Sequence, residues 1–171
     1  ITKEQLSDPQ VLRGIDMQVK PADMTGFYVD QLFQKAGITF NDINTVDLPT
    51  ATLNEALQSG SLDLVQISEP WITVILQSGE AVLLVGAEEV VPNGQLSSIV
   101  FSQRIIRDNP EIGRRVMVAY LKGLAKYYEG KTERNVEIVV KNTQLDKEIV
   151  KAMCWPFLSE GGKPDISSIL A

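Results

Sequence analysis

The sequence predicts an α/β fold in which helices cover both faces of a doubly wound, mainly parallel sheet. Over the first ninety residues, short runs rich in β-branched side chains alternate with helical patterns. A glycine follows each helical pattern, at the position where a left-handed residue commonly ends a helix. Strands that are separated by helices of ordinary length need right-handed crossover connections, and such connections make the strands parallel.

The elements of this region follow one another in three repeats of strand and helix, with a last strand after them. The first helix has a clear apolar face, because Tyr28 and Leu32 are four residues apart. Hydroxyl side chains at 50–52 are suited to cap the second helix, and Ser68 or Glu69 to cap the third. We expect strands at 14–19, 43–48, 62–67 and 81–85, and helices that end at Gly37, Gly60 and Gly79.

After Val90 the pattern becomes mainly helical. We expect a turn at 92–94, a fifth strand at 97–102, helices at 111–129, 136–140, 145–153 and a short apolar segment at 166–170. The long helix carries apolar residues round much of its surface, so it needs partners on more than one side. We infer that the chain is a segment of a larger protein whose other lobe lies mostly upstream. A dimer that buries the same faces is the alternative.

Composition excludes several kinds of chemistry. The chain has 171 residues, of which 44% are apolar and 22% charged, as in ordinary globular proteins. It has no histidine, which excludes Ser-His-Asp and Cys-His nucleophiles and histidine-ligated zinc. Cys154 is the single cysteine, so the chain forms no internal disulfide, and we interpret this residue as a small buried hydrophobic side chain.

The charge is unevenly distributed along the chain. Residues 1–90 contain 4 basic and 13 acidic side chains, whereas residues 91–171 contain 12 basic and 9 acidic ones. The acidic first half should repel nucleic acids, and the basic residues of the second half are scattered along helices. Apolar runs such as 81–85 are far shorter than the roughly 20 residues that span a bilayer, so we expect no membrane insertion of this segment.

Three loops are candidates for a ligand site. Ligands of parallel α/β sheets lie beyond the carboxyl ends of the strands, where the helices that follow present backbone amides. The loops at 20–26, 48–52 and 66–71 occupy such positions. Helix capping and core packing explain each loop taken alone, but Trp71 beside Glu69 also offers an aromatic wall next to a carboxylate. The candidate ligand-binding residues are Met24, Thr25, Gly26, Thr50, Ala51, Thr52, Ser68, Glu69 and Trp71.

An enzymatic site is not required by these residues. Asp23, Glu69 and Asp63 are carboxylates that a folded chain could bring together, although Asp23 reads as a surface acid and Asp63 as the start of a strand. The sequence has no glycine-rich phosphate loop and no calcium-loop pattern. We therefore predict no catalytic residue, no metal site and no cofactor.

The order of these motifs resembles a known family. From about Leu12 to Glu129 the chain is similar to the substrate-binding proteins of the nitrate/taurine/alkanesulfonate class of ABC importers, whose superfamily includes the thiamine-pyrimidine synthase-like proteins. The motifs that carry the resemblance are Leu12-Arg13-Gly14, the run at 35–43, the Ala-Leu-x-Ser-Gly-x-Leu-Asp element at 56–63, Ser68-Glu69-Pro70-Trp71 and Asn109-Pro110-Glu111.

The resemblance implies a type II periplasmic-binding-protein-like fold, in which two lobes close on a ligand. It implies that residues 1–90 form one complete doubly wound lobe, lobe II. Residues 91–171 then form the hinge, near 91–95, and the C-terminal part of lobe I, which is mostly helical. The N-terminal part of lobe I is absent from this sequence.

The same resemblance implies a function. The expected role is the solute-binding component of an ABC importer, which captures a small organic or anionic ligand between its lobes and delivers it to a permease. The implied location is periplasmic or extracellular, with a lipoprotein anchor. Two alternatives remain: an enzyme on the same fold, like the pyrimidine synthase or menaquinone-pathway proteins, and a ligand-sensing domain of a regulatory protein.

Overall fold

The computed structural model describes residues 8–92, 94 and 97–163. The chain divides into two compact units, Ile1–Gly94 and Gln95–Ala171. The first unit contains the sheet, and the described part of the second unit is helical. Among the described helices, none combines the length and the apolar character needed to cross a bilayer.

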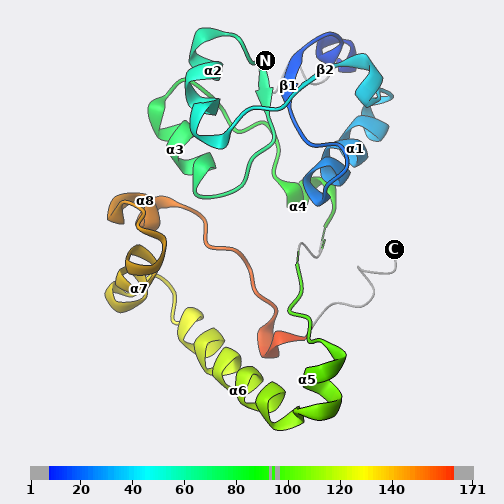
Figure 1. The fold of residues 1–171 in the computed structure, drawn as a ribbon. Helices are drawn as coiled ribbons and strands as arrows, with labels where there is room; N and C mark the ends of the chain where they lie inside the picture. Colours follow the sequence, from blue (N-terminus) through cyan, green and yellow to red (C-terminus); the bar gives the residue numbers. More distant parts are fainter. Residues whose placement is uncertain (1–7, 93, 95–96, 164–171) are drawn as a thin grey trace. The chain divides into compact units, whose positions relative to one another are not determined.

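A three-stranded parallel sheet organises the first unit (Figure 1). Its strands are β1 (Asp16–Gln18), β2 (Asn44–Val46) and β3 (Leu64–Val65), and their order is β2-β1-β3. The central strand β1 pairs with both neighbours, so that Met17 is in register with Thr45 on one side and with Leu64 on the other. All three carboxyl ends therefore lie at the same edge of the sheet.

Helices cover both faces of this sheet. The helical segments of the unit are η2 (Pro9–Leu12), α1 (Met24–Ala36), η3 (Phe40–Asp42), η4 (Thr50–Thr52), α2 (Leu53–Ser59), α3 (Trp71–Ser78) and α4 (Ala87–Val90). In Figure 1, α1 lies on one side of the sheet, and α2 and α3 lie on the other. Because the strand order reverses direction after β2, right-handed crossovers place successive helices on opposite faces. The predicted doubly wound arrangement is confirmed.

Two apolar clusters fill the spaces between the sheet and its helices. Phe33 of α1 packs with Met17 and Val29 in the first cluster. Leu53, Leu62 and Ile75 form the centre of the second cluster, with α2 and α3. Adjacent residues of β3 divide between the clusters, because Leu64 packs on the first and Val65 on the second, as alternating side chains of a strand must.

The predicted ends of the three helices are confirmed. Gly37, Gly60 and Gly79 have φ values of 69°, 71° and 78°. Each donates its backbone N–H to a carbonyl in the last turn of the helix that it follows. A left-handed residue at this position satisfies carbonyls that the helix leaves unpaired, and glycine adopts it without strain.

Two predicted strands do not form. Residues 81–85 and 97–102 do not form strands in the part of the chain that the structure describes, and Val82 and Val100 are 65% and 85% exposed. β-branched residues favour strands because they fit a half-buried pleated surface, so a segment with no sheet edge beside it gains nothing from that preference. The chain instead forms the short helix α4 and, after Ser102, helix α5 (Gln103–Asp108).

The second unit is built on helices. After α5 come α6 (Pro110–Tyr127), α7 (Glu133–Thr143), α8 (Lys147–Ala152) and the short η5 (Glu160–Gly162). The three helices expected at 111–129, 136–140 and 145–153 are thus confirmed, with shifted ends. The apolar segment expected at 166–170 lies outside the described residues.

The apolar core of the second unit lies between α7 and α8. Val136, Val150 and Met153 are buried there, and Trp155 packs on them. The Trp155 ring stacks on Tyr127, with 5.3 Å between ring centroids, and its N–H donates to the Val150 carbonyl at 3.0 Å. Cys154 is exposed, so the prediction of a buried cysteine is wrong. The neighbouring Met153 takes the buried position instead.

Helix α6 has little contact with this core. Leu124 is its one buried residue, whereas Ile112, Val116 and Leu121 are exposed. An amphipathic helix of this length normally buries a continuous apolar stripe. The apolar surface that the sequence predicts for this helix is therefore present and largely open in the described residues.

Asn135 joins the end of α6 to the start of α7. Its side chain is only 7% exposed, and its amide donates to the carbonyls of Lys126 at 2.7 Å and Gly130 at 2.9 Å. These two hydrogen bonds reach one carbonyl in the last turn of α6 and one in the turn that follows it.

We expect Asn135→Ala to lower the free energy of unfolding by about 1–3 kcal/mol, because a buried side chain loses both of its hydrogen bonds to backbone carbonyls. Asn142→Ala is the control. The Asn142 amide also donates to a helix carbonyl, that of Ile138, but at an exposed position, so the loss should stay within about 0.5 kcal/mol. Urea unfolding of both variants tests the prediction, and equal losses would contradict it.

Candidate functional site

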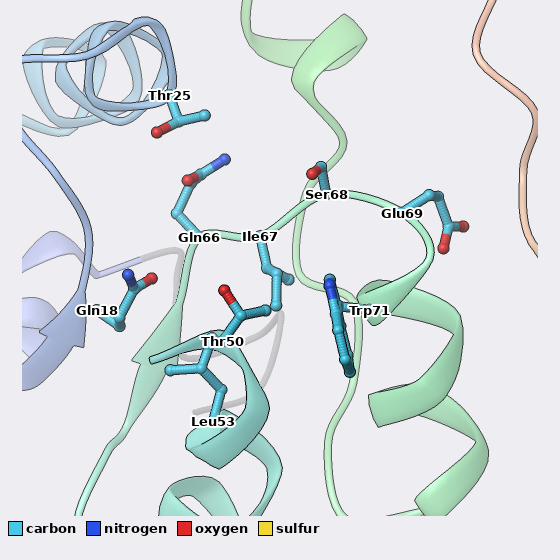
Figure 2. Close-up of a pocket in the computed structure, with 9 residues that line it drawn as sticks. All are labelled: Gln18, Thr25, Thr50, Leu53, Gln66, Ile67, Ser68, Glu69 and Trp71. Atoms are coloured by element: carbon cyan, nitrogen blue, oxygen red, sulfur yellow. The ribbon is translucent and has the colours of Figure 1, made fainter. Parts of the chain in front are cut away.

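A hollow that is open to solvent lies beyond the carboxyl ends of β1 and β3, within the first unit (Figure 2). Its volume is about 290 Å³. It is formed by the end of β1, the first turn of α1, the η4–α2 junction and the segment between β3 and α3. The residues that line it are Gln18, Thr25, Thr50, Leu53, Gln66, Ile67, Ser68, Glu69 and Trp71.

Five of the nine candidate ligand-binding residues line this hollow: Thr25, Thr50, Ser68, Glu69 and Trp71. The other four, Met24, Gly26, Ala51 and Thr52, are not part of its lining. Met24, Ala51 and Thr52 are exposed at the starts of their helical segments. Contact between any of the nine residues and a ligand stays a prediction.

Sequence reasoning missed the two glutamines of the hollow. Gln18 is the last residue of β1, and Gln66 directly follows β3. The backbone N–H of Gln66 donates to the carbonyl of Gln18 at 3.0 Å, so the two residues are neighbours across the sheet. An amide side chain at the carboxyl end of a strand is the signal that was available for both residues.

Asp23 closes the amino end of α1. Its carboxylate accepts the backbone N–H groups of Thr25 at 2.8 Å and Gly26 at 2.9 Å, together with the Thr25 hydroxyl. The Thr25 hydroxyl, followed by the Gly26 N–H, holds the pKa of Asp23 below its usual value. Asp23 is exposed, as expected. The sequence did not predict that Asp23 caps α1. The Asp23 carboxylate accepts the amides of Thr25 and Gly26, which we expected to face a ligand.

Gly26 has a structural role in this loop. A Cβ atom at this position would lie 2.6 Å from the carbonyl oxygen of Pro21 and closer still to that of Lys20. The backbone of the loop before α1 therefore fills the space beside Gly26. The sequence suggested that this glycine allows a ligand to approach, but it allows the chain itself to approach.

Glu69 caps α3, which was one of the predicted alternatives. Its carboxylate accepts the backbone N–H of Thr73 at 3.1 Å and the Thr73 hydroxyl at 3.1 Å. Figure 2 shows this carboxylate turned away from Gln18 and Gln66. One backbone amide in the first turn of α3 thus has a carboxylate of the chain as its acceptor, whereas two amides do so in α1.

The hydroxyls expected to cap α2 do not do so. Neither Pro49 nor Thr52 makes a side-chain cap. Instead, the Thr52 hydroxyl donates to the Pro49 carbonyl at 2.9 Å. The turn η4 precedes α2 directly, and the N–H of Leu53, the first residue of α2, donates to the Thr50 carbonyl of η4.

Asp63 lies at the opposite edge of the sheet from the hollow. Its carboxylate accepts the backbone N–H of Asp16, at the amino end of β1, at 2.9 Å. It therefore does not meet Asp23 or Glu69, and the three-carboxylate arrangement is wrong. Within the described ranges, no group of three or more Cys, Asp or Glu side chains is placed to hold a metal ion.

Trp71 forms an apolar wall of the hollow. It is the first residue of α3 and is 38% exposed, so it is not a core residue. Ile67 and the buried Leu53 add apolar surface next to it (Figure 2). Opposite this surface stand amide and hydroxyl groups, so the lining combines an apolar side with a polar one.

No lysine or arginine belongs to the lining of the hollow among the described residues. Lys20 follows β1, but its ammonium group pairs with the Asp47 carboxylate at 3.4 Å, and both side chains are exposed. The polar side of the hollow is therefore made of uncharged groups together with the capping carboxylate of Glu69.

The family model described as NMT1/THI5 like matches residues 1–134, which is most of the chain. The chain belongs to the NMT1/THI5-like family. This membership, together with the structural matches, confirms the resemblance to the substrate-binding proteins of nitrate, taurine and sulfonate importers.

Two solved structures have the same fold over 84% of this chain. The periplasmic aliphatic sulphonate binding protein SsuA from Escherichia coli matches with a TM-score of 0.66 and 17% identity, over 46% of its own length. The alkanesulfonate-binding protein SsuA from Xanthomonas axonopodis pv. citri, bound to MOPS, matches with a TM-score of 0.63 and 20% identity, over 48%. No significant match was found among curated protein sequences.

These matches confirm the predicted fold class, that of the periplasmic binding proteins. The chain spans about half the length of each matched structure.

The capping role of Asp23 predicts a pH-dependent stability difference. Asp23→Ala should lower the free energy of unfolding by about 0.5–2 kcal/mol at neutral pH. Because folding lowers the pKa of Asp23, its stabilisation is present above the unfolded pKa of about 3.9 and is lost as the pH falls through the folded value. Unfolding curves should therefore show the wild-type protein and Asp23→Ala converging in stability below about pH 4.

Asp23→Asn is the control, because it keeps a capping oxygen and should lose less stability than Asp23→Ala. A stability difference between wild type and Asp23→Ala that stays the same from pH 7 to pH 3 would contradict the prediction.

The close contact at Gly26 predicts that even a methyl group destabilises the loop. We expect Gly26→Ala to lower the free energy of unfolding by about 1–3 kcal/mol through overpacking. Gly123→Ala is the matched control in α6, where a Cβ would meet nothing within 4 Å. That variant should gain about 0.5–1 kcal/mol, because alanine favours a helix interior. Chemical denaturation of the two variants should give changes of opposite sign, and a stabilised Gly26→Ala would contradict the contact.

Proposed function

We propose that this chain provides part of the solute-binding component of an ABC importer. In this proposal, residues 1–90 are lobe II of a two-lobed binding protein, and residues 91–171 are the hinge and the C-terminal part of lobe I. Family membership and the matched binding-protein fold support the proposal.

The hollow at the carboxyl edge of the sheet carries this proposal. Small-molecule sites are concave, mainly apolar, and contain a few polar groups that fix the orientation of the ligand. The hollow has the Trp71 wall on one side and amide and hydroxyl groups on the other. Its volume of about 290 Å³ is near the lower end of the roughly 300–1,000 Å³ that is typical of such sites. An open half-site of this kind is completed when a hinge closes the opposite lobe over it.

The proposed ligand is a small organic or anionic solute, which is then delivered to a permease. The two matched proteins are described as binders of sulphonates, and one of them holds MOPS. The match from Escherichia coli is described as periplasmic, which supports a location outside the cytoplasm for this protein. A lipoprotein anchor and delivery of the solute to an ABC permease belong to the same proposal.

A binding role is favoured over an enzymatic one. Both matched structures are of binding proteins. In addition, the two carboxylates nearest the hollow, those of Asp23 and Glu69, accept hydrogen bonds from the helices that they cap. The matches give no support to the alternative of a dimer.

Trp71 provides the test of this proposal. In the full-length gene product, Trp71→Ala should weaken the binding of a solute by about tenfold or more, because the ring forms one wall of the hollow. The melting temperature should fall little, because the ring is only partly buried. The solute is found by thermal-shift screening of small organic acids, amides and sulfonates, and its affinity is measured by isothermal titration calorimetry.

Trp155→Ala is the matched control. This tryptophan stacks on Tyr127 and bonds the Val150 carbonyl, and it does not line the hollow. It should lower the melting temperature more than Trp71→Ala and leave the affinity unchanged. The proposal fails if no solute stabilises the wild-type protein, or if Trp71→Ala binds as tightly as wild type.

A further inference from the structure

We propose that the hollow selects an uncharged ligand that presents a hydrogen-bond donor next to an acceptor, such as a carboxamide or a sulfonamide, through the side-chain amides of Gln18 and Gln66. This inference rests on the proposed solute-binding function and narrows its ligand to one chemical class. It departs from the anionic ligands for which the two matched proteins are named.

Gln18 is a largely buried residue whose side-chain amide has no hydrogen-bond partner within the described residues. The residue is only 9% exposed and ends the central strand. Its carbonyl accepts the N–H of Gln66, so its backbone is used by the sheet. Among the described side chains, no fully buried polar atom lacks a partner, so the amide of Gln18 keeps its access to the hollow. A ligand that enters the hollow can therefore form the hydrogen bonds that the Gln18 amide lacks.

Gln66 contributes a second side-chain amide to the lining of the hollow. It directly follows β3, is half-buried and also lines the hollow (Figure 2). Each glutamine amide offers two N–H donors and one carbonyl acceptor, and exchanging its nitrogen and oxygen preserves this capacity. A carboxamide or sulfonamide pairs with both kinds of group. A carboxylate or sulfonate has only acceptors, so it leaves the glutamine oxygens without a donor.

The electrostatics of the edge also disfavour an anion. Sites for anions at this edge of a parallel sheet use the backbone amides of helix starts. Here Asp23 accepts the Thr25 and Gly26 amides of α1, and Glu69 accepts the Thr73 amide of α3. None of the described lining residues is a lysine or arginine, and residues 1–90 have 13 acidic side chains against 4 basic ones.

A cation is disfavoured as well. The positive ends of two helix dipoles offset the charges of Asp23 and Glu69. The Glu69 carboxylate is also turned away from the two glutamines (Figure 2). The remaining polar groups of the lining are the uncharged side chains of Thr25, Thr50 and Ser68. Trp71 and Ile67 supply a surface for an apolar or aromatic part of the ligand.

The test compares probes of nearly the same shape that differ in charge. Benzenesulfonamide is paired with benzenesulfonate, and benzamide with benzoate, each titrated into the full-length gene product at pH 7 and followed by calorimetry and ligand-observed NMR. Each neutral probe should bind about tenfold more tightly than its anion, because the anion leaves amide oxygens unpaired.

Substitutions then assign the preference to the glutamines. Gln18→Met keeps the volume of the side chain and removes its hydrogen bonds, so it should weaken binding of the neutral probes about tenfold and change anion binding little. Gln66→Met is a second variant at a less buried position, in case Gln18→Met does not fold. Gln58→Met is the control, since Gln58 is exposed on α2 and does not line the hollow.

Two results would overturn the inference. One is an anion that binds as tightly as its neutral partner, and the other is neutral binding that survives both glutamine substitutions. Tight binding of the anions alone would leave the solute-binding proposal standing. That broader proposal fails only if the whole solute panel, anions included, leaves the wild-type protein unchanged.

Discussion

The arrangement of the first unit depends on the hydrogen bonding of β1 to strands on both of its sides. This central strand fixes the order β2-β1-β3 and brings the carboxyl ends of all three strands to one edge. The carboxylate of Asp63 holds the other end of β1, at the backbone N–H of Asp16. Residues as far apart in sequence as Gln18 and Trp71 meet in one hollow because these pairings are made.

At the starts of α1 and α3, carboxylates of the chain accept helix amides at this edge of the sheet. Both helices point their amino ends toward the edge, which would ordinarily attract an anion. The chain supplies the negative groups itself, through Asp23 and Glu69. The hollow consequently presents amides, hydroxyls, an indole ring and the capping carboxylate of Glu69, and its electrostatic character differs from what helix direction alone would give.

The sequence predicted features that depend on local chemistry and missed those that depend on a distant neighbour. Glycines with positive φ marked the helix ends, and apolar spacing marked α6, because both signals act within a few residues. Residues 81–85 and 97–102 have strand-like composition, but composition does not specify a partner strand. Trp71 was found because it follows a loop at the edge. Gln18 was missed because its significance comes from a side-chain amide that has no hydrogen-bond partner among the described residues. The prediction that Cys154 is buried was wrong for a similar reason, because Met153 and not Cys154 packs in the core of the second unit.

The residues that hold the sheet together are different from the carboxylates that cap α1 and α3, and this difference affects how related proteins can diverge. The sheet is held by backbone pairing and by the two apolar clusters, and neither Asp23 nor Glu69 belongs to these clusters. An exchange of one capping carboxylate for alanine, which cannot accept a hydrogen bond, would free backbone N–H groups at the edge without changing the residues of the strands. Descendants of one ancestor can therefore acquire opposite charge preferences through very few mutations, while their architecture stays constant.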